Sequence, residues 1–330
     1  MQNLEKISLN IYSFGFYAGF MKKASLNQTI LDIDGLCKLA KEFGFGGIEF
    51  PFDRYYKKSQ IQTGLQKIKE IKNSNLRVFL DIENMNIDYL FNLIPLLPDI
   101  GISVLRVKMK QVGETIYGGN RYLVKKNFDK SIKIFKEQLL ALKPILQKYS
   151  ISLVIENHQD LHSSEIIEIS NIVSEEIIGV NWDVGNSISV GETPDSFYAA
   201  TKDRIRNVHL KDYFICKSDS GFKLVRSAFG EGYVDYKTIL PQLLDNKNII
   251  NISIELGAQY PRICNINEES YWEAIKHTGA NISKFKSFIG NNISAKNKCR
   301  KDSLSPDNMI KSEINDIKIS INNIAEILGE

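Results

Sequence analysis

Short apolar runs alternate with longer amphipathic stretches along this chain. Eight runs have the length and composition of buried strands: Ile7–Tyr12, Gly46–Phe50, Leu76–Glu83, Ile102–Lys108, Ile151–Asn157, Ile177–Asp183, Ile205–Lys211 and Ile250–Glu255. Regular alternation of strand and helix is typical of a parallel sheet. Eight such units favour an α/β protein with a closed (β/α)8 TIM barrel, because the chain has no GxGxxG phosphate loop that would indicate an open doubly wound sheet.

The stretches between these runs carry apolar residues at helical spacing. They predict helices over Thr29–Phe43, Gln60–Asn73, Asn127–Tyr149 and Asp235–Asn246. We expect Asn127, Ser163 and Asp235 to cap helix N-termini, since short polar side chains accept hydrogen bonds from the first free backbone N–H groups. Gly44 is expected to end the first helix in the left-handed conformation.

The pattern changes near Ser287. Residues 290–306 are rich in Asn, Ser and Lys, which is typical of a flexible connector. Beyond them, apolar residues recur at alternating spacings of four and three, which predicts an apolar helix seam: Ile310, Ile314, Ile317, Ile321, Ile324 and Leu328. We therefore divide the chain into a barrel (1–288), a linker (289–306) and a C-terminal amphipathic helix (307–330), which is expected to dock on the barrel or on a second subunit.

Four of the predicted strands carry, at or within two residues of their C-terminal end, a residue that can bind a metal: Glu156, Asp183, His209 and Glu255. Successive side chains in a strand point to opposite faces, and the count puts all four on the inward face. Active sites of TIM barrels lie at the carboxyl ends of the strands. Three carboxylates and one imidazole suit a single divalent cation, Mn²⁺, Mg²⁺ or Co²⁺, with Zn²⁺ also possible. The sequence therefore predicts one metal site at this end of a barrel.

Composition limits the classes of partner. The chain has 330 residues, 43% of them hydrophobic, and a formal net charge of +3, which is ordinary for an enzyme with a sizeable core and gives no case for nucleic acid or a membrane surface. We find no apolar run long enough to span a bilayer and no signal-peptide pattern at the start, and we expect a cytoplasmic protein. The four cysteines have no metal-binding spacing, so they are expected to be buried or incidental thiols in a reducing compartment.

The four metal-binding candidates, in this order on these strands, resemble the xylose-isomerase-like TIM-barrel superfamily and its sugar phosphate isomerase/epimerase family. The resemblance covers roughly Leu4 to Phe288 and includes the segments Glu156-Asn157-His158 and His209-Leu210-Lys211. It implies that the four residues hold one divalent cation, and that Glu156 and Glu255 also exchange a proton with the substrate. The implied activity is isomerisation or epimerisation of a sugar or sugar derivative through a cis-enediolate, in carbohydrate metabolism. Some relatives on this scaffold eliminate water instead, so a dehydratase of a keto-polyol stays open.

Further residues are candidates for binding the sugar substrate: Lys211, His158, Arg226, Arg106, Lys108, Glu49 and Asn186. Lys211 has an alternative interpretation as a partner of Asp212, and Arg226 as a solvated loop charge. Arg106 and Lys108 suggest an anionic or polyhydroxylated substrate, since paired cations suit carboxylate or phosphate. Some epimerases of the family have His where this chain has Asn186, which leaves the substrate open.

Two other classes of function are weighed. The superfamily also contains an apurinic endonuclease that binds three zinc ions, but this chain has only four His and a small net charge, both unsuited to that chemistry. A non-catalytic binding barrel would bind metal without turnover. The sequence does not name the sugar, the metal or the oligomeric state, and a homo-oligomer is possible.

Overall fold

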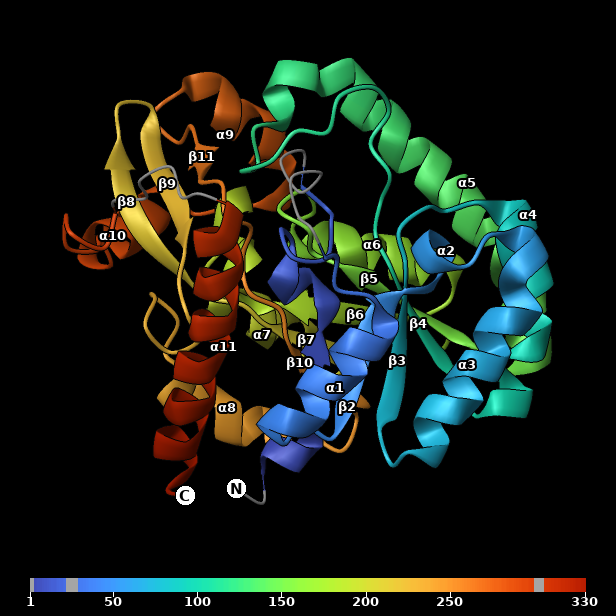
Figure 1. Cartoon of the computed structure of the whole chain (residues 1–330). Coiled ribbons are helices and arrows are strands. Elements are labelled where there is room, and N and C mark those ends of the chain that lie inside the picture. Colours follow the sequence, from blue (N-terminus) through green and yellow to red (C-terminus); the bar gives the residue numbers. More distant parts are fainter. Residues whose placement is uncertain (1–2, 22–28, 300–305) are drawn as a thin grey trace.

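Eight parallel strands close into one barrel, so the predicted fold class is confirmed. The computed structural model describes residues 3–21, 29–299 and 306–330. The strands follow the order β1-β10-β7-β6-β5-β4-β3-β2 around the barrel (Figure 1). Their bounds are β1 Ile7–Asn10, β2 Gly47–Pro51, β3 Arg77–Ile82, β4 Val104–Val107, β5 Ser152–Glu156, β6 Ile178–Asp183, β7 Ile205–Leu210 and β10 Asn251–Ile254.

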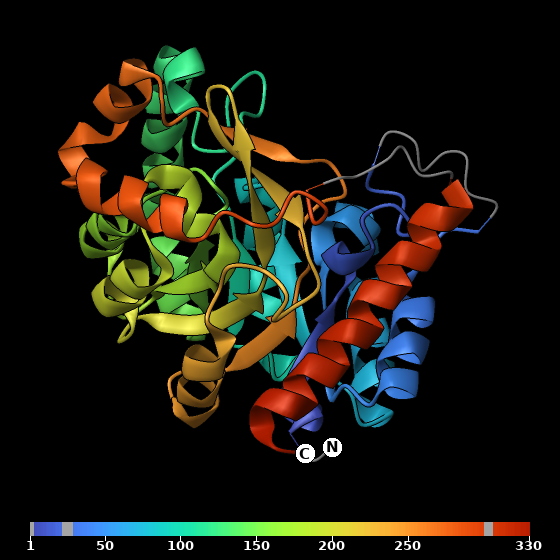
Figure 2. The ribbon, with the colours of Figure 1, turned by 90° about the vertical axis from the view of Figure 1, so that its left-hand side faces the viewer.

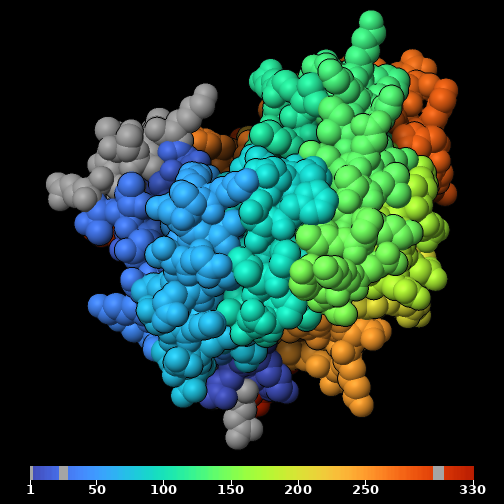
Figure 3. All heavy atoms as spheres, turned by 90° about the vertical axis from the view of Figure 1, so that its right-hand side faces the viewer, coloured from blue at the N-terminus to red at the C-terminus, as the bar shows by residue number. Residues whose placement is uncertain are grey.

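Helices surround the barrel, and Figure 3 shows the face along which α3, α4 and α5 follow one another. The helices are α1 Ile33–Phe43, α2 Phe52–Tyr55, α3 Ile61–Asn73, α4 Ile87–Leu93, α5 Lys125–Tyr149, α6 Ser163–Val173, α7 Pro194–Thr201, α8 Tyr236–Asp245, α9 Glu269–Ile275, α10 Ile282–Asn291 and α11 Pro306–Leu328. Among the described helices, none combines the length and apolarity needed to cross a membrane.

Helix ends follow local side-chain chemistry. Gly44 ends α1 with φ +83°, and the Asp235 carboxylate caps α8 by accepting from the Thr238 N–H, as predicted. The caps expected at Asn127 and Ser163 are wrong. Helix α5 begins earlier, at Lys125, and α6 is capped by His162, whose ring nitrogen accepts from the Ser164 N–H. Capping by a histidine ring is uncommon, because oxygen side chains are usually preferred there.

A second sheet stands at the carboxyl end of the barrel and was not expected from the sequence. Strands β8 Tyr213–Ser218, β9 Gly221–Arg226 and β11 Arg262–Cys264 form it, in the antiparallel order β11-β9-β8 (Figure 1). Cys216 of β8 forms a disulfide with Cys299, with the two Cα atoms 5.7 Å apart. The expectation of unpaired thiols is therefore wrong for this pair, and it holds for Cys37 and Cys264.

The barrel interior has an apolar layer below a polar one. Phe79, Val104 and Val154 form the small apolar cluster. Two residues further along β3 and β4, Asp81 and Arg106 are 0% and 1% exposed, on the inward face as strand parity predicts. Charged groups at such depth are costly unless they are paired or bind an ion. Asp81 and Arg106 therefore need partners among the groups directly above them.

Helix α11 packs against the same chain. It lies alongside α8 and the first turns after β1, and both termini lie at one end of the molecule (Figure 2). Ile317, Ile321 and Ile324 are buried, and the buried Glu313 carboxylate accepts from the backbone N–H groups of Phe16 and Tyr17 at 2.8 and 3.0 Å. Of the two expected docking modes, the structure has the one in cis. Residues 300–305 of the predicted linker lie outside the described residues.

Candidate metal centre and substrate pocket

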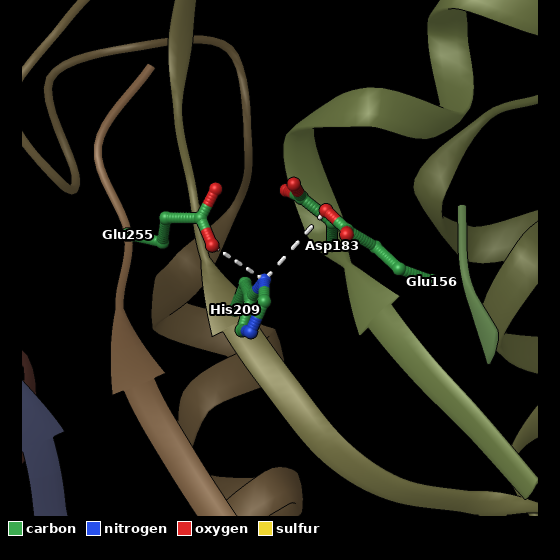
Figure 4. Close-up of side chains that lie close together, drawn as sticks. All are labelled: Glu156, Asp183, His209 and Glu255. Atoms are coloured by element: carbon green, nitrogen blue, oxygen red, sulfur yellow. Dashed lines mark ion pairs between the residues drawn. The ribbon is translucent and has the colours of Figure 1, made fainter. Parts of the chain in front are cut away.

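Four predicted ligands meet at the carboxyl end of the barrel. Glu156, Asp183 and His209 lie at the ends of β5, β6 and β7, and Glu255 follows β10 directly. One ligand atom from each lies within 4.8 Å of the others, and all four residues are buried. Figure 4 shows Glu255 approaching His209 from one side while Glu156 and Asp183 approach from the other. The phase of the strands therefore brings together the set that the sequence singles out.

His209 is held between two carboxylates. Its Nε2 donates to Glu49 Oε1 at 2.8 Å, while Nδ1 faces Glu255 Oε2 at 2.8 Å and Glu156 Oε1 at 3.8 Å. Burial by itself lowers the pKa of His209, but the charges of Glu49 and Glu255 raise that pKa to about 10. Since Nε2 is bonded to Glu49, Nδ1 is the ring nitrogen directed at the carboxylate cluster.

Glu49 differs from its expected place. It is fully buried beneath His209, where it also accepts hydrogen bonds from Asn207 and Asn251 at 3.0 Å each. Both of its oxygens are occupied by this polar layer, so they do not face the pocket or a sugar hydroxyl. Glu49 instead orients the imidazole, a role that the partners of metal-binding histidines commonly have.

Two carboxylate oxygens in the cluster have no hydrogen-bond partner among the described residues: Glu156 Oε1 and Asp183 Oδ1, both buried. The other oxygen of Glu156 is bonded by the Arg106 guanidinium. The other oxygen of Asp183 accepts from the Lys211 ammonium and from the Asn186 amide. Buried polar atoms are nearly always satisfied, so two orphaned anionic oxygens beside an imidazole fit a site for a divalent cation.

Lys211 bridges two of the cluster residues and does not pair with Asp212. Its ammonium bonds to Asp183 and lies 2.6 Å from Glu255 Oε1, with the side chain almost wholly buried. Asp212 points elsewhere and accepts backbone N–H groups of the loop after β9, including Gly230 and Gly232 at 3.2 and 2.9 Å. Lys211 therefore belongs to the carboxylate cluster, whereas Asp212 stabilises the loop after β9.

A cavity of about 230 Å³ opens above the cluster. Its buried part includes Glu255, Lys211 and Asn186, and its half-buried part includes His158, Lys108 and Tyr117. Burial and the charges of Lys108 and Lys211 lower the pKa of His158 well below its usual range, so its ring is neutral. The size suits a small molecule with several polar groups.

The candidate substrate contacts separate into two groups. Those that line the cavity are Lys211, His158, Lys108, Asn186 and Arg226. Glu49 and Arg106 lie beneath the cluster instead, because each is committed to one of its members. Arg226 is not a solvated loop charge: it donates to the backbone oxygens of Ser13 and Gly257 and pairs with Asp316 of α11 at 2.7 Å.

The sequence analysis missed several residues of the cavity wall. Tyr12 lies two residues beyond β1 and donates to Glu83 at 2.6 Å, and its strand parity was a usable signal. Tyr117 and Arg262 come from the loop after β4 and from β11, and Arg262 stacks on the Tyr117 ring 3.6 Å from the centroid. Their meeting depends on the second sheet, which the sequence analysis did not predict. His162 and His277 lie outside the cavity and bond to helix ends and Glu165.

Known proteins resemble this chain in sequence and in fold. A family model described as a xylose isomerase-like TIM barrel matches residues 37–279. Over 119 residues, 36% of the chain, the sequence is 24% identical to the 3-oxo-isoapionate decarboxylase of Pectobacterium atrosepticum, and the aligned region spans 43% of that enzyme.

Solved structures agree on the fold. The probable 3-DHS dehydratase AsbF from Bacillus anthracis has a TM-score of 0.52 and 14% identity, covering 84% of this chain and 100% of that one. The 3-keto-D-glucoside 4-epimerase YcjR from E. coli has a TM-score of 0.52 and 12% identity, covering 84% and 99%. At these identities the likeness extends to the fold alone.

Proposed function

Because the chain belongs to the xylose isomerase-like TIM barrel family, we propose that it is a divalent-metal-dependent isomerase or epimerase of a sugar or sugar derivative. The reaction is a proton transfer next to a carbonyl, through a cis-enediolate. The observation that carries this proposal is the buried cluster itself, in which two orphaned carboxylate oxygens and an imidazole nitrogen converge below a polar cavity.

Glu156, Asp183, His209 and Glu255 are the residues that would hold the cation, with Mn²⁺, Mg²⁺ or Co²⁺ suited to three carboxylates and Zn²⁺ also possible. A cation bound there supplies Lewis-acid polarisation of the substrate carbonyl and its neighbouring hydroxyl. Glu49 keeps the His209 Nδ1 directed at the cluster, and Arg106 fixes one oxygen of Glu156 so that the other stays directed inward.

Proton transfer is assigned to Glu255 and Glu156. Glu255 lines the cavity, so its carboxylate can reach a substrate carbon, while Glu156 approaches from the opposite side of His209 (Figure 4). One carboxylate removes the proton and the other returns it, which inverts the stereocentre or moves the carbonyl. Lys211 stabilises the carboxylate charge, and the neutral His158 ring can bind a substrate oxygen without adding charge.

The test is exchange of hydrogen with solvent. Ketoses and keto-inositols are incubated in D₂O with the protein and Mn²⁺, and each is followed by NMR. We expect deuterium to enter the carbon next to the carbonyl of one substrate, with formation of its epimer or isomer. A metal-stripped sample is the control and should exchange at the background rate. Binding of a polyol with no exchange in the entire panel would favour a binding barrel over an enzyme.

A lyase is the second candidate. It is supported by the 24% identity to a decarboxylase over part of the chain and by Asn186, which differs from the His of some epimerases. Loss of water or of CO₂ from a keto-polyol or keto acid passes through the same kind of stabilised enolate. The same NMR samples separate the two outcomes: an epimer keeps every carbon and oxygen atom of the substrate, and a lyase product has lost water or CO₂.

A further inference from the structure

The cavity wall contains two cations that form no ion pair with the described residues. Its wall contains five Lys and Arg side chains: Arg54, Lys108, Lys211, Arg226 and Arg262. Three of them have acidic partners: Lys211 pairs with Asp183 and Glu255, Arg226 with Asp316, and Arg54 with Glu83. Within the part of the chain that the structure describes, neither Lys108 nor Arg262 forms an ion pair. Lys108 lies over the Tyr12 ring, and Arg262 over the Tyr117 ring.

These two cations flank one patch of the wall. Arg262 stacks on the face of Tyr117, and the Tyr117 ring in turn meets the His158 ring with centroids 5.9 Å apart. On the other side, Lys108 lines the same cavity as His158, with its Nζ 5.9 Å from the centroid of the Tyr12 ring. Lys108, Tyr117, His158 and Arg262 are all half-buried, whereas Lys211 and Glu255 of the metal cluster are buried. The unpaired cations therefore lie further out than the metal cluster.

The unpaired charges of Lys108 and Arg262 destabilise the ligand-free protein. Lys108 is in a partly desolvated position beside Arg106, and both effects lower its pKa to about 8. Two cations without acidic partners in one small cavity repel each other and lose hydration, unless an anion binds between them. An arginine held flat on a ring presents its N–H edge for paired hydrogen bonds to carboxylate or phosphate oxygens.

We propose that Lys108 and Arg262 form a subsite for an anionic group of the substrate, a carboxylate or a phosphate, at the outer end of the cavity. This deepens the proposed function and rests on it in one respect, namely that the other end of the same molecule reaches the metal cluster. The substrate class is then an acidic or phosphorylated keto sugar, in which carbonyl and hydroxyl lie at one end and the anion at the other.

The experiment measures binding of three probes to the full-length protein with saturating Mg²⁺, by calorimetry. D-fructose is the neutral probe, 2-keto-D-gluconate carries a carboxylate, and D-fructose 6-phosphate carries a phosphate. We expect one anionic probe to bind at least about tenfold more tightly than fructose, since a charged hydrogen bond contributes roughly tenfold to a hundredfold in affinity. The anionic probe that binds more tightly than fructose shows whether a carboxylate or a phosphate is the recognised group.

Variants test whether Lys108 and Arg262 account for the tighter binding of the anionic probe. Lys108→Met and Arg262→Met should each remove about tenfold or more of the affinity for the preferred anion and leave fructose binding unchanged. Arg262→Lys keeps the charge and should lose less. Lys110→Met is the matched control, because Lys110 is exposed on the same loop and bonds to Asn84, outside this cavity. Circular dichroism confirms that each variant is folded.

The proposal is overturned if both anions bind no more tightly than fructose, or if the Met variants weaken all three probes equally. Its failure is separable from failure of the proposed function. Solvent deuterium entering a neutral ketose, without any preference for anions, refutes the subsite and keeps the enzyme. Anion binding that depends on Lys108 and Arg262, without metal-dependent exchange in any probe, keeps the subsite and refutes the enzyme.

Discussion

Glu255→Gln and Glu156→Gln each lower turnover by about 10²–10⁴-fold, because glutamine keeps an oxygen for the metal but cannot accept the substrate proton. Metal affinity should fall only moderately, since each variant retains all four donor atoms and only one of them becomes an amide oxygen. The measurement is kcat for the substrate identified by deuterium exchange, at several Mn²⁺ concentrations, together with calorimetric titration of Mn²⁺ into the metal-free variants.

Asp183→Asn is the matched control for these two variants. Asp183 belongs to the same cluster, but one of its oxygens is committed to Lys211 and Asn186, and it has no proposed role in proton transfer. Its loss of activity should therefore be recovered in part by excess Mn²⁺. If the two glutamate variants recover as readily, both residues are ligands only, and Lys211 and His158 become the first candidates for the base.

Lys211→Met should destabilise the metal-free protein by about 3–5 kcal/mol, the usual cost of removing one partner from a buried ion pair. The Lys211 ammonium pairs with both Asp183 and Glu255, and all three side chains are buried. A divalent cation on the same carboxylates supplies the missing positive charge. The loss of stability should therefore be much smaller with saturating Mn²⁺ than without metal, as measured by urea unfolding.

Lys217→Met provides the comparison, because Lys217 is exposed on β8 and surface substitutions of this kind usually change stability by less than about 0.5 kcal/mol. An equal loss of stability for Lys211→Met with and without Mn²⁺ would mean that the cation does not share the carboxylates with Lys211. The cluster would then be an internal ion-pair network of the fold, and the metal would have to bind elsewhere.

The barrel was predictable from the sequence because its strands are buried on both faces and appear as short runs dominated by apolar residues. The second sheet was harder to predict. Strands β8 and β9 are short segments rich in apolar residues, joined by a polar turn at Ser218–Gly221, a hairpin signal that could have been used. Strand β11 has three residues and no pattern of its own, so the position of Arg262 could not be found from the sequence.

The four cluster residues were predictable for a different reason. Each ends an apolar run, and strand parity alone directs it inward. Their supporting partners depend on the register between neighbouring strands, which the sequence does not specify: Asp81 lies opposite Arg106, and Asp183 lies opposite His209. For this reason Arg106 and Glu49 were expected at the substrate, whereas register and depth commit them to Glu156 and His209.

The central claim is that one divalent cation binds where the four side chains converge. The most direct test is an anomalous-difference map from a crystal of the full-length protein soaked in MnCl₂. We expect a single strong peak within about 2.0–2.6 Å of donor atoms from Glu156, Asp183, His209 and Glu255. A map in which Lys211 still bridges Asp183 and Glu255 and no manganese peak lies among these residues would contradict the account.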